Sequence, residues 1–332
     1  MSFGKTLLTA VLCVICADYL QHAFAQNPAK KITVAYASLT PSTVWFSLEK
    51  HLGFFRKEGL NPEFILTRNS VIAGQAMLAG SFDYMVPTGT VVPAVVQSRQ
   101  PFKIVFTTLR THYSLIAQPQ IRSVEDLRKK TIGIASIGSS NDLIMREILK
   151  SHGLDPLKDI TYLGLGSSSV DRFAALVSGG VHATFLSAPF DSRAIEMGYR
   201  KVAKAIDYVR WPQAGLATTE EKIRRSPQEV EKMARAALKG LRFALSQRDY
   251  VIPKVMQSFR VTQKEAAQSY EALQEEAVSS GSLAEQDQIA VISMIKPGGN
   301  PAEDIPPGRV FEYRFVQKAQ RDLAAWTPQA PR

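Results

Sequence analysis

Thr131–Gly153 reads TIGIASIGSSNDLIMREILKSHG and contains one complete strand–loop–helix unit. Its first five residues, 131–135, are mostly apolar and partly β-branched, a pattern typical of a buried strand. Small polar residues fill the loop at 136–141, and the helix expected over 140–151 ends at Gly153. The stretch therefore predicts a buried strand whose carboxyl end opens onto a polar loop.

The same alternation of strand and helix continues on both sides of this unit. Further strands are predicted over 32–37, 63–67, 82–86, 103–108, 113–117, 160–164, 183–186 and 201–206. Such alternation is typical of a mostly parallel α/β sheet. From Glu220 to Ala325 the pattern is almost entirely helical, and a helical tail needs a surface to pack on. We expect two α/β lobes, with the tail returning to the first.

The first 25 residues have the organisation of a secretion signal. Lys5 precedes an apolar run from Leu7 to Ala17, and Ala23-Phe24-Ala25 ends the segment in a small-x-small pattern. The run is much shorter than the ~20 apolar residues that cross a bilayer. We expect cleavage after Ala25 and a mature protein outside the cytoplasm.

Composition narrows the possible functions. Both cysteines, Cys13 and Cys16, lie inside the predicted signal, which leaves the mature chain no thiolate for a disulfide, a metal site or nucleophilic catalysis. Leu12 and Ile15 precede them where a lipoprotein cysteine needs a small residue, which disfavours lipidation. The net charge of +10 comes from basic residues scattered among acidic ones. This pattern argues against nucleic-acid binding and suits attraction of an anionic solute.

Small hydroxyl and glycine residues cluster where several predicted strands end. In open α/β sheets, ligands bind beyond the carboxyl ends of the strands, beside free N–H groups of the following helices. Two clusters facing one another would hold a small polar or anionic group, whereas helix capping explains any single cluster. The candidate ligand-binding residues from these loops are Ser38, Leu39, Thr40, Pro87, Thr88, Gly89, Ser136, Ser139, Ser140 and Asn141.

Aromatic and basic residues add further candidates. Trp45 follows the loop after the first strand, where its ring either covers a ligand or packs in the core. Trp211 lies near the expected second crossing between lobes, as a hinge or cleft-edge residue. Arg68 or Arg110 would hold an anionic head group, and Tyr84 is an alternative to Trp45 as the cover of an organic tail.

Common catalytic signatures are absent from the sequence. It holds no GxxxxGK[ST] phosphate loop, no GxGxxG after a strand and no GxSxG elbow. The histidines outside the signal show no metal-ligand spacing, and only His112 lies where the chain would cross between lobes. We therefore predict no catalytic residue, no metal and no cofactor.

Five segments resemble, in their order and spacing, one family of binding proteins. They are LGFFRKEGL (52–60), QAMLAGSFDY (75–84), SVEDLRKKTIGI (123–134), LVSGGVHA (176–183) and APF (188–190). This series resembles the periplasmic substrate-binding proteins of the sulfonate, nitrate and taurine group, within the wider NMT1/THI5-like family. His182 and Ala188 replace acidic residues of the family pattern, which puts in doubt any ligand that needs those acids.

The resemblance implies a type II periplasmic-binding-protein fold, with two α/β lobes joined by two crossings around a cleft. Lobe 1 would hold residues 26–110 and 215–332, and lobe 2 residues 111–214. Ligand contacts would come from the loop after the first strand, the helix at Gln75, the 87–89 turn and the 136–141 loop.

The function implied is a monomeric periplasmic receptor that delivers a small solute, anionic or aromatic, to an ABC transporter permease. Two alternatives remain: an exported sensory or partner-binding module of the same fold, and an NMT1/THI5-like enzyme. The enzyme branch has a cysteine-rich motif and no secretion signal, and neither property fits this sequence.

Overall fold

The computed structural model describes residues 31–37, 48, 52–67, 69–111, 113–295 and 305–330. Residues 32–332 group as one compact unit. The predicted signal and cleavage site lie outside the described residues. So do several residues singled out above: Ser38, Leu39, Thr40, Trp45, Arg68 and His112.

The first sheet has the strand order β2-β1-β3-β10-β4. Its strands are β1 (Lys31–Tyr36), β2 (Asn61–Leu66), β3 (Tyr84–Met85), β4 (Phe102–Leu109) and β10 (Ala214–Thr219). β1 pairs with β3 in parallel, whereas β10 pairs antiparallel with β3 and β4. Val34, Ile104 and Phe106 are fully buried, so this sheet has core packing on its faces.

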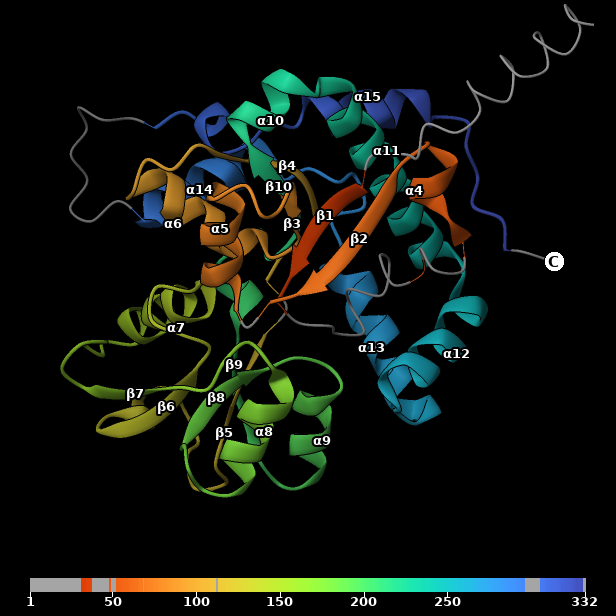
Figure 1. Cartoon of the computed structure of the whole chain (residues 1–332). Helices are drawn as coiled ribbons and strands as arrows, with labels where there is room; N and C mark the ends of the chain where they lie inside the picture. The colour runs from red at the N-terminus through yellow and green to blue at the C-terminus, as the bar shows by residue number, and fades with distance from the viewer. Residues whose placement is uncertain are drawn as a thin grey trace, which may run out of the picture. The chain divides into compact units, whose positions relative to one another are not determined.

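The second sheet has the strand order β7-β6-β8-β5-β9 (Figure 1). Its strands are β5 (Ser114–Ala117), β6 (Lys130–Ile134), β7 (Ile160–Gly164), β8 (Ala183–Leu186) and β9 (Arg200–Lys204). β6 is parallel to β7 and β8, and β5 is antiparallel to β8 and β9. Both sheets are therefore mixed, with parallel strands followed by helices.

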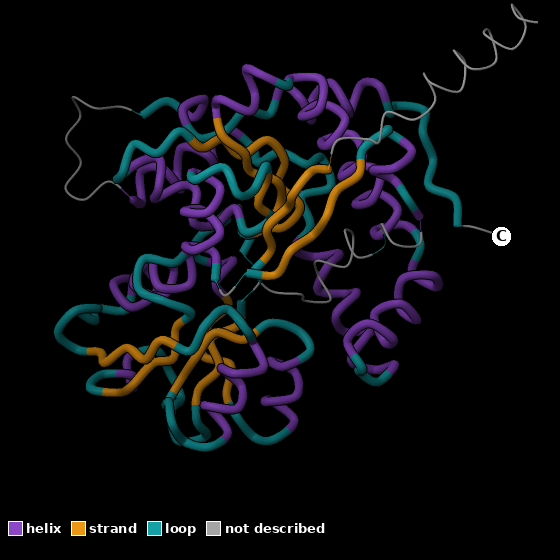
Figure 2. The backbone as a smooth tube through the Cα atoms, in the orientation of Figure 1, coloured by secondary structure: helices purple, strands orange, loops and turns teal. Residues whose placement is uncertain are grey.

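Helices pack against both sheets (Figure 2). α11 and α15 contact β4 of the first sheet, while α8 and α9 contact β8 and β5 of the second. Within the described residues, no helix is both long and apolar enough to cross a membrane. The helices are α4 (Phe54–Lys57), α5 (Ser70–Leu78), α6 (Val91–Val96), α7 (Ser140–Ser151), α8 (Ser169–Val177), α9 (Phe190–Glu196), α10 (Glu220–Arg225), α11 (Pro227–Ser246), α12 (Arg248–Phe259), α13 (Gln263–Glu276), α14 (Glu285–Ile295) and α15 (Arg314–Asp322), with 3-10 turns η2 (Thr88–Thr90), η3 (Glu125–Leu127), η4 (Ala205–Asp207) and η5 (Pro307–Arg309).

The unit over 131–153 folds as its sequence predicts. β6 is followed by a polar turn, and Ser139 caps α7 by accepting a hydrogen bond from the backbone N–H of Asp142 at 3.3 Å. This cap satisfies one of the free N–H groups at the helix start. After α7, Gly153 takes a left-handed conformation at φ 70°, which a residue with a side chain rarely adopts. The Ser139 cap and the left-handed Gly153 thus explain where α7 begins and ends.

The chain passes from the first sheet to the second after β4 and returns before β10. Hydrogen bonds join the two crossings. The backbone N–H of Gln213 donates to the carbonyl of Leu109 at 2.9 Å, and the Thr111 hydroxyl donates to the carbonyl of Val209 at 2.6 Å. Thr111 Oγ1 in turn accepts from the backbone N–H of Trp211 at 2.8 Å. The lobe boundaries at 110/111 and 214/215 stay a prediction.

Candidate functional site

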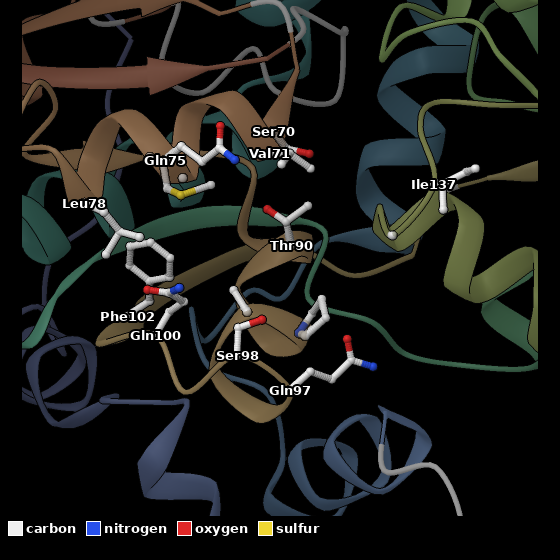
Figure 3. A pocket seen from close by; sticks show the side chains of 15 residues that line it. Ser70, Val71, Gln75, Leu78, Thr90, Gln97, Ser98, Gln100, Phe102 and Ile137 are labelled. Carbon is white, nitrogen blue, oxygen red and sulfur yellow. The ribbon is translucent and has the colours of Figure 1, made fainter.

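A pocket of about 300 Å³ lies between α5, α6 and the turn after β6 (Figure 3). Gln75, predicted as a ligand contact, lines it from α5, while Ile137 and Gly138 line it from the turn that follows β6 in the second sheet. Figure 3 shows Ile137 on its own stretch of ribbon, apart from the other labelled side chains. Residues from segments of both sheets therefore border one pocket.

The described residues that line this pocket carry no charge. Apolar side chains form much of its wall, and the polar groups are amides and hydroxyls. The lining consists of Ser70, Val71, Gly74, Gln75, Leu78, Met85, Thr90, Pro93, Ala94, Gln97, Ser98, Gln100, Phe102, Ile137 and Gly138.

The predicted turn at 87–89 lies against the second crossing. The indole N–H of Trp211 donates to the carbonyl of Gly89 at 2.8 Å, and the Thr88 hydroxyl donates to the carbonyl of Pro212 at 2.9 Å. A Cβ atom at Gly89 would lie 2.7 Å from Ser140 Oγ, so only glycine fits there without a shift. Trp211 is 0% exposed, which makes it a buried link between this turn and the crossing.

A chain of polar side chains starts at the first turn of α7. Ser140 Oγ donates to Gln213 Oε1 at 3.2 Å, and Gln213 Nε2 donates to the Tyr113 hydroxyl at 2.9 Å. Burial raises the pKa of Tyr113, so this hydroxyl stays protonated. Sequence reasoning missed Gln213 and Tyr113, although both belong to the crossings where a cleft was expected. Together with Ser140 they place two hydroxyls and an amide at the junction of the two sheets.

The other predicted residues of the 136–141 loop act mainly in local structure. The Ser139 hydroxyl donates to the carbonyl of Ser136 at 2.6 Å in addition to capping α7. Asn141 Oδ1 accepts from the backbone N–H of Ala135 at 3.2 Å. The Asn141 side chain is buried, and its Nδ2 has no hydrogen-bond partner among the described residues. Capping therefore accounts for Ser139, whereas Asn141 keeps a donor without a partner among the described residues.

Arg110 lies at the start of the first crossing, directly after β4, and its backbone contacts Glu276 at the end of α13. Its backbone N–H donates to the carbonyl of Glu276 at 3.2 Å, and its Nε is buried without a hydrogen-bond partner among the described residues. Burial, strengthened by the negative charges of Asp191 and Glu275, raises the pKa of Glu276 to about 9. Glu276 is consequently uncharged at neutral pH.

Arg172 of α8 was not predicted as a functional residue, yet it is fully buried. Its guanidinium donates to the carbonyls of Phe185 and Gly166, both at 2.9 Å, and to Ser169 Oγ at 3.2 Å. All three acceptors are uncharged, and burial lowers the pKa of the guanidinium. One signal in the sequence could have predicted this burial: Arg172 lies four residues before Leu176, so both side chains are on the same, buried face of α8.

Tyr84, predicted as a possible cover for a ligand tail, is instead a core residue. It is fully buried, and its hydroxyl donates to Glu229 of α11 at 3.0 Å. In the part of the chain that the structure describes, no three His, Asp or Glu side chains gather as a metal site. The groups assembled at the junction are hydroxyls and amides, which can donate and accept hydrogen bonds.

Comparison with known proteins gives a family and a fold. The family model described as NMT1/THI5 like matches residues 41–250. A comparison with curated proteins finds no match. Among solved structures, a protein from Bordetella bronchiseptica RB50 is 16% identical with a TM-score of 0.77, over 89% of this chain and 98% of that one.

Two further solved structures are named as binding proteins. The alkanesulfonate-binding protein SsuA from Xanthomonas axonopodis pv. citri, bound to MOPS, is 17% identical with a TM-score of 0.67, over 80% of this chain and 91% of its own. The nitrate-binding protein NrtA from Synechocystis PCC 6803 is 12% identical with a TM-score of 0.72, over 92% of both chains. Two SsuA proteins, from Escherichia coli and Methylobacillus flagellatus KT, also share the fold, as does DszB in complex with biphenyl-2-sulfinic acid.

At these identities the structural likeness concerns the fold alone, and it confirms the predicted periplasmic-binding-protein architecture with its helical C-terminal part. The family match is broader than a motif, since residues 41–250 make up more than half of the 332-residue chain. The chain belongs to the NMT1/THI5-like family.

Proposed function

We propose that this protein is a periplasmic solute-binding receptor that closes two α/β lobes over a small organic or anionic solute and delivers it to an ABC importer. The observation that carries the proposal is that Ser140 lies against both Gln213 and Gly89. Ser140 belongs to α7, Gln213 to the second crossing, and Gly89 to the turn after β3 of the first sheet. SsuA and NrtA, which share the fold, bind an alkanesulfonate and nitrate.

Binding without chemistry suits the groups at this junction. A solute that contacts residues from both sheets' segments binds the closed arrangement better than the open one, so its binding energy shifts the population toward closure. The Nδ2 of Asn141 and the Nε of Arg110 are buried donors without a partner among the described residues, and we assign them to the solute in an arrangement where the site is open.

We assign the solute contacts to the junction residues and to the loop after the first strand. Trp211 and Gly89 act as supports for this site, because both are buried against one another. The full set of proposed contacts and supports is Ser38, Leu39, Thr40, Trp45, Gln75, Pro87, Thr88, Gly89, Arg110, Ser136, Ser139, Ser140, Asn141 and Trp211.

The test is solute binding by the purified mature chain, measured by calorimetry and by the change in melting temperature. The panel contains alkanesulfonates, nitrate, aromatic acids and pyrimidines, and at least one class should bind. Ser140→Ala and Asn141→Ala should each weaken that binding about tenfold, the equivalent of one hydrogen bond. Ser151→Ala is the matched control, since Ser151 lies at the other end of α7 and bonds only the carbonyl of Ile148. No binding across the whole panel would count against a receptor.

Two alternatives are separated by simple observations. A solute recovered chemically unchanged after prolonged incubation supports a receptor, and a converted solute supports an enzyme. Neighbouring genes for an ATPase and a permease support import, whereas a neighbouring sensor kinase supports an exported sensory module. Light scattering on the purified mature chain tests the proposal that it is a monomer.

A further inference from the structure

The pocket between α5 and α6 has a lining that disfavours charge. Among its described lining residues, the polar groups are those of Ser, Thr and Gln side chains, and none is ionisable. A charged ligand group placed there would lose part of its hydration and would meet neutral hydroxyl and amide groups but no counter-ion among the described residues, which costs free energy. The ligand group that suits this pocket is therefore uncharged.

Two amide groups in the pocket are free to bind a neutral polar group. The side chains of Gln75 and Gln100 line the pocket, and neither makes a hydrogen bond within the described part of the protein. In Figure 3, Gln75 lies above the pocket and Gln100 below it. An amide offers both donors and an acceptor. Such a pair can bind a hydroxyl, a carbonyl or an amide of a ligand.

The apolar part of the lining points to a ring or an alkyl chain. Met85 and Phe102 are buried at the base, while Ile137 is 76% exposed on the turn after β6. An apolar ligand group that covered Ile137 would remove its surface from water. The pocket volume of about 300 Å³ equals that of roughly ten water molecules, far more than a small inorganic anion fills.

We propose that this pocket binds an uncharged, largely apolar ring or chain of the solute, so that the physiological ligand is an organic molecule and not a small inorganic anion. The proposal rests on the proposed receptor function and adds the chemical class of the ligand. Any anionic end of the solute lies outside the pocket, on the side of the polar junction.

Gly74 offers a way to fill the pocket without disturbing the fold. It lies in α5, and a Cβ atom at this position would meet only the Phe102 ring, at an ordinary contact distance of 3.9 Å. Alanine and leucine are also better helix formers than glycine. Gly74→Leu therefore occupies the pocket, and Gly74→Ala is the matched control that leaves most of it open.

The experiment measures binding of two homologous series, the alkane-1-sulfonates from methane to octane and the primary amides from acetamide to octanamide. In the wild type, affinity should rise about fourfold per methylene until the pocket is full. Gly74→Leu should remove this rise while Gly74→Ala keeps it. Hexane-1,6-disulfonate should bind at least about tenfold more weakly than hexane-1-sulfonate, because its second charge would enter the pocket.

An affinity independent of chain length would overturn the proposal, as would a Gly74→Leu protein that binds long chains as tightly as the wild type. If neither series binds while nitrate does, the proposal is wrong and the receptor function stands. Melting curves for both variants establish that the folded state is intact, so a lost chain-length effect reports on the pocket.

Discussion

Glu276, at the carboxyl end of α13, gives the sharpest test of the electrostatics beside the proposed cleft. Burial raises the pKa of its carboxyl to about 9, and Asp191 and Glu275 raise it further than the positive charge of Lys204 lowers it. Glu276→Gln keeps the shape of the side chain and removes its ionisation. The variant should therefore lose one specific contribution to the pH dependence of stability.

The sign follows from proton counting. Between the ordinary pKa of 4.5 and about 9, the folded protein holds a proton on Glu276 that the unfolded chain has released. The wild-type free energy of unfolding consequently falls as pH rises through this interval, by about 1.4 kcal/mol per pH unit. From pH 6 to pH 8, the wild type should lose up to roughly 3 kcal/mol relative to Glu276→Gln.

The assay is urea unfolding followed by tryptophan fluorescence at pH 6, 7 and 8. The control is Glu271→Gln, which removes an exposed carboxylate from the same helix. This control should track the wild type at every pH. The argument is refuted if the free energies of unfolding of the wild type and Glu276→Gln differ by the same amount at all three pH values. That result would mean that Glu276 ionises in the folded protein as it does in the unfolded chain.

Three further predictions concern the packing between the sheets. Trp211→Phe keeps an aromatic side chain, but it leaves the buried Gly89 carbonyl without its donor and a void beside it, and should lower the urea-derived free energy of unfolding by at least about 1–3 kcal/mol. Gly89→Ala places a methyl group against Ser140 Oγ and should lower the free energy of unfolding by about 1–3 kcal/mol. Gly74→Ala is the control, because Gly80 has a left-handed backbone that would itself be strained by alanine. Arg193 of α9 pairs with Glu265 of α13, and a double-mutant cycle with alanine should give a coupling of about 0.5–1 kcal/mol that disappears in 1 M salt. A salt-independent coupling would show that the pair acts through packing and not through charge.

Regular elements were predictable because their patterns are local. The apolar run at 131–135, the caps and the glycine at 153 lie within one short stretch, and β6 and α7 form where that stretch predicts them. The alternation of strands and helices then predicts the α/β fold class. The antiparallel insertion of β10 between β3 and β4 has no such local signal, because it depends on pairing with strands more than 100 residues earlier.

The candidate site was predicted only in part, for the same reason. Strand-end loops are visible in a sequence, so Gly89 and Ser140 were among the predicted residues, whereas Gln75 was predicted from the family resemblance. Gln213 and Tyr113 become site residues only because the two crossings lie side by side, and they are separated by 100 positions. Arg172 and Glu276 belong to residue types that normally face water, and the burial of Arg172 and partial burial of Glu276 are visible only in the folded chain.

The hydrogen bonds that join the two crossings limit how the sheets can move. Thr111 is hydrogen-bonded to both Val209 and Trp211, so the two crossings are linked to each other and are not independent connections. If the two lobes close over a solute as proposed, crossings joined in this way should allow fewer relative orientations of the sheets than two independent connections would. Fewer open orientations mean that less orientational entropy is lost on closure, so more of the intrinsic binding energy appears as affinity. The hinge would tune affinity without touching the solute.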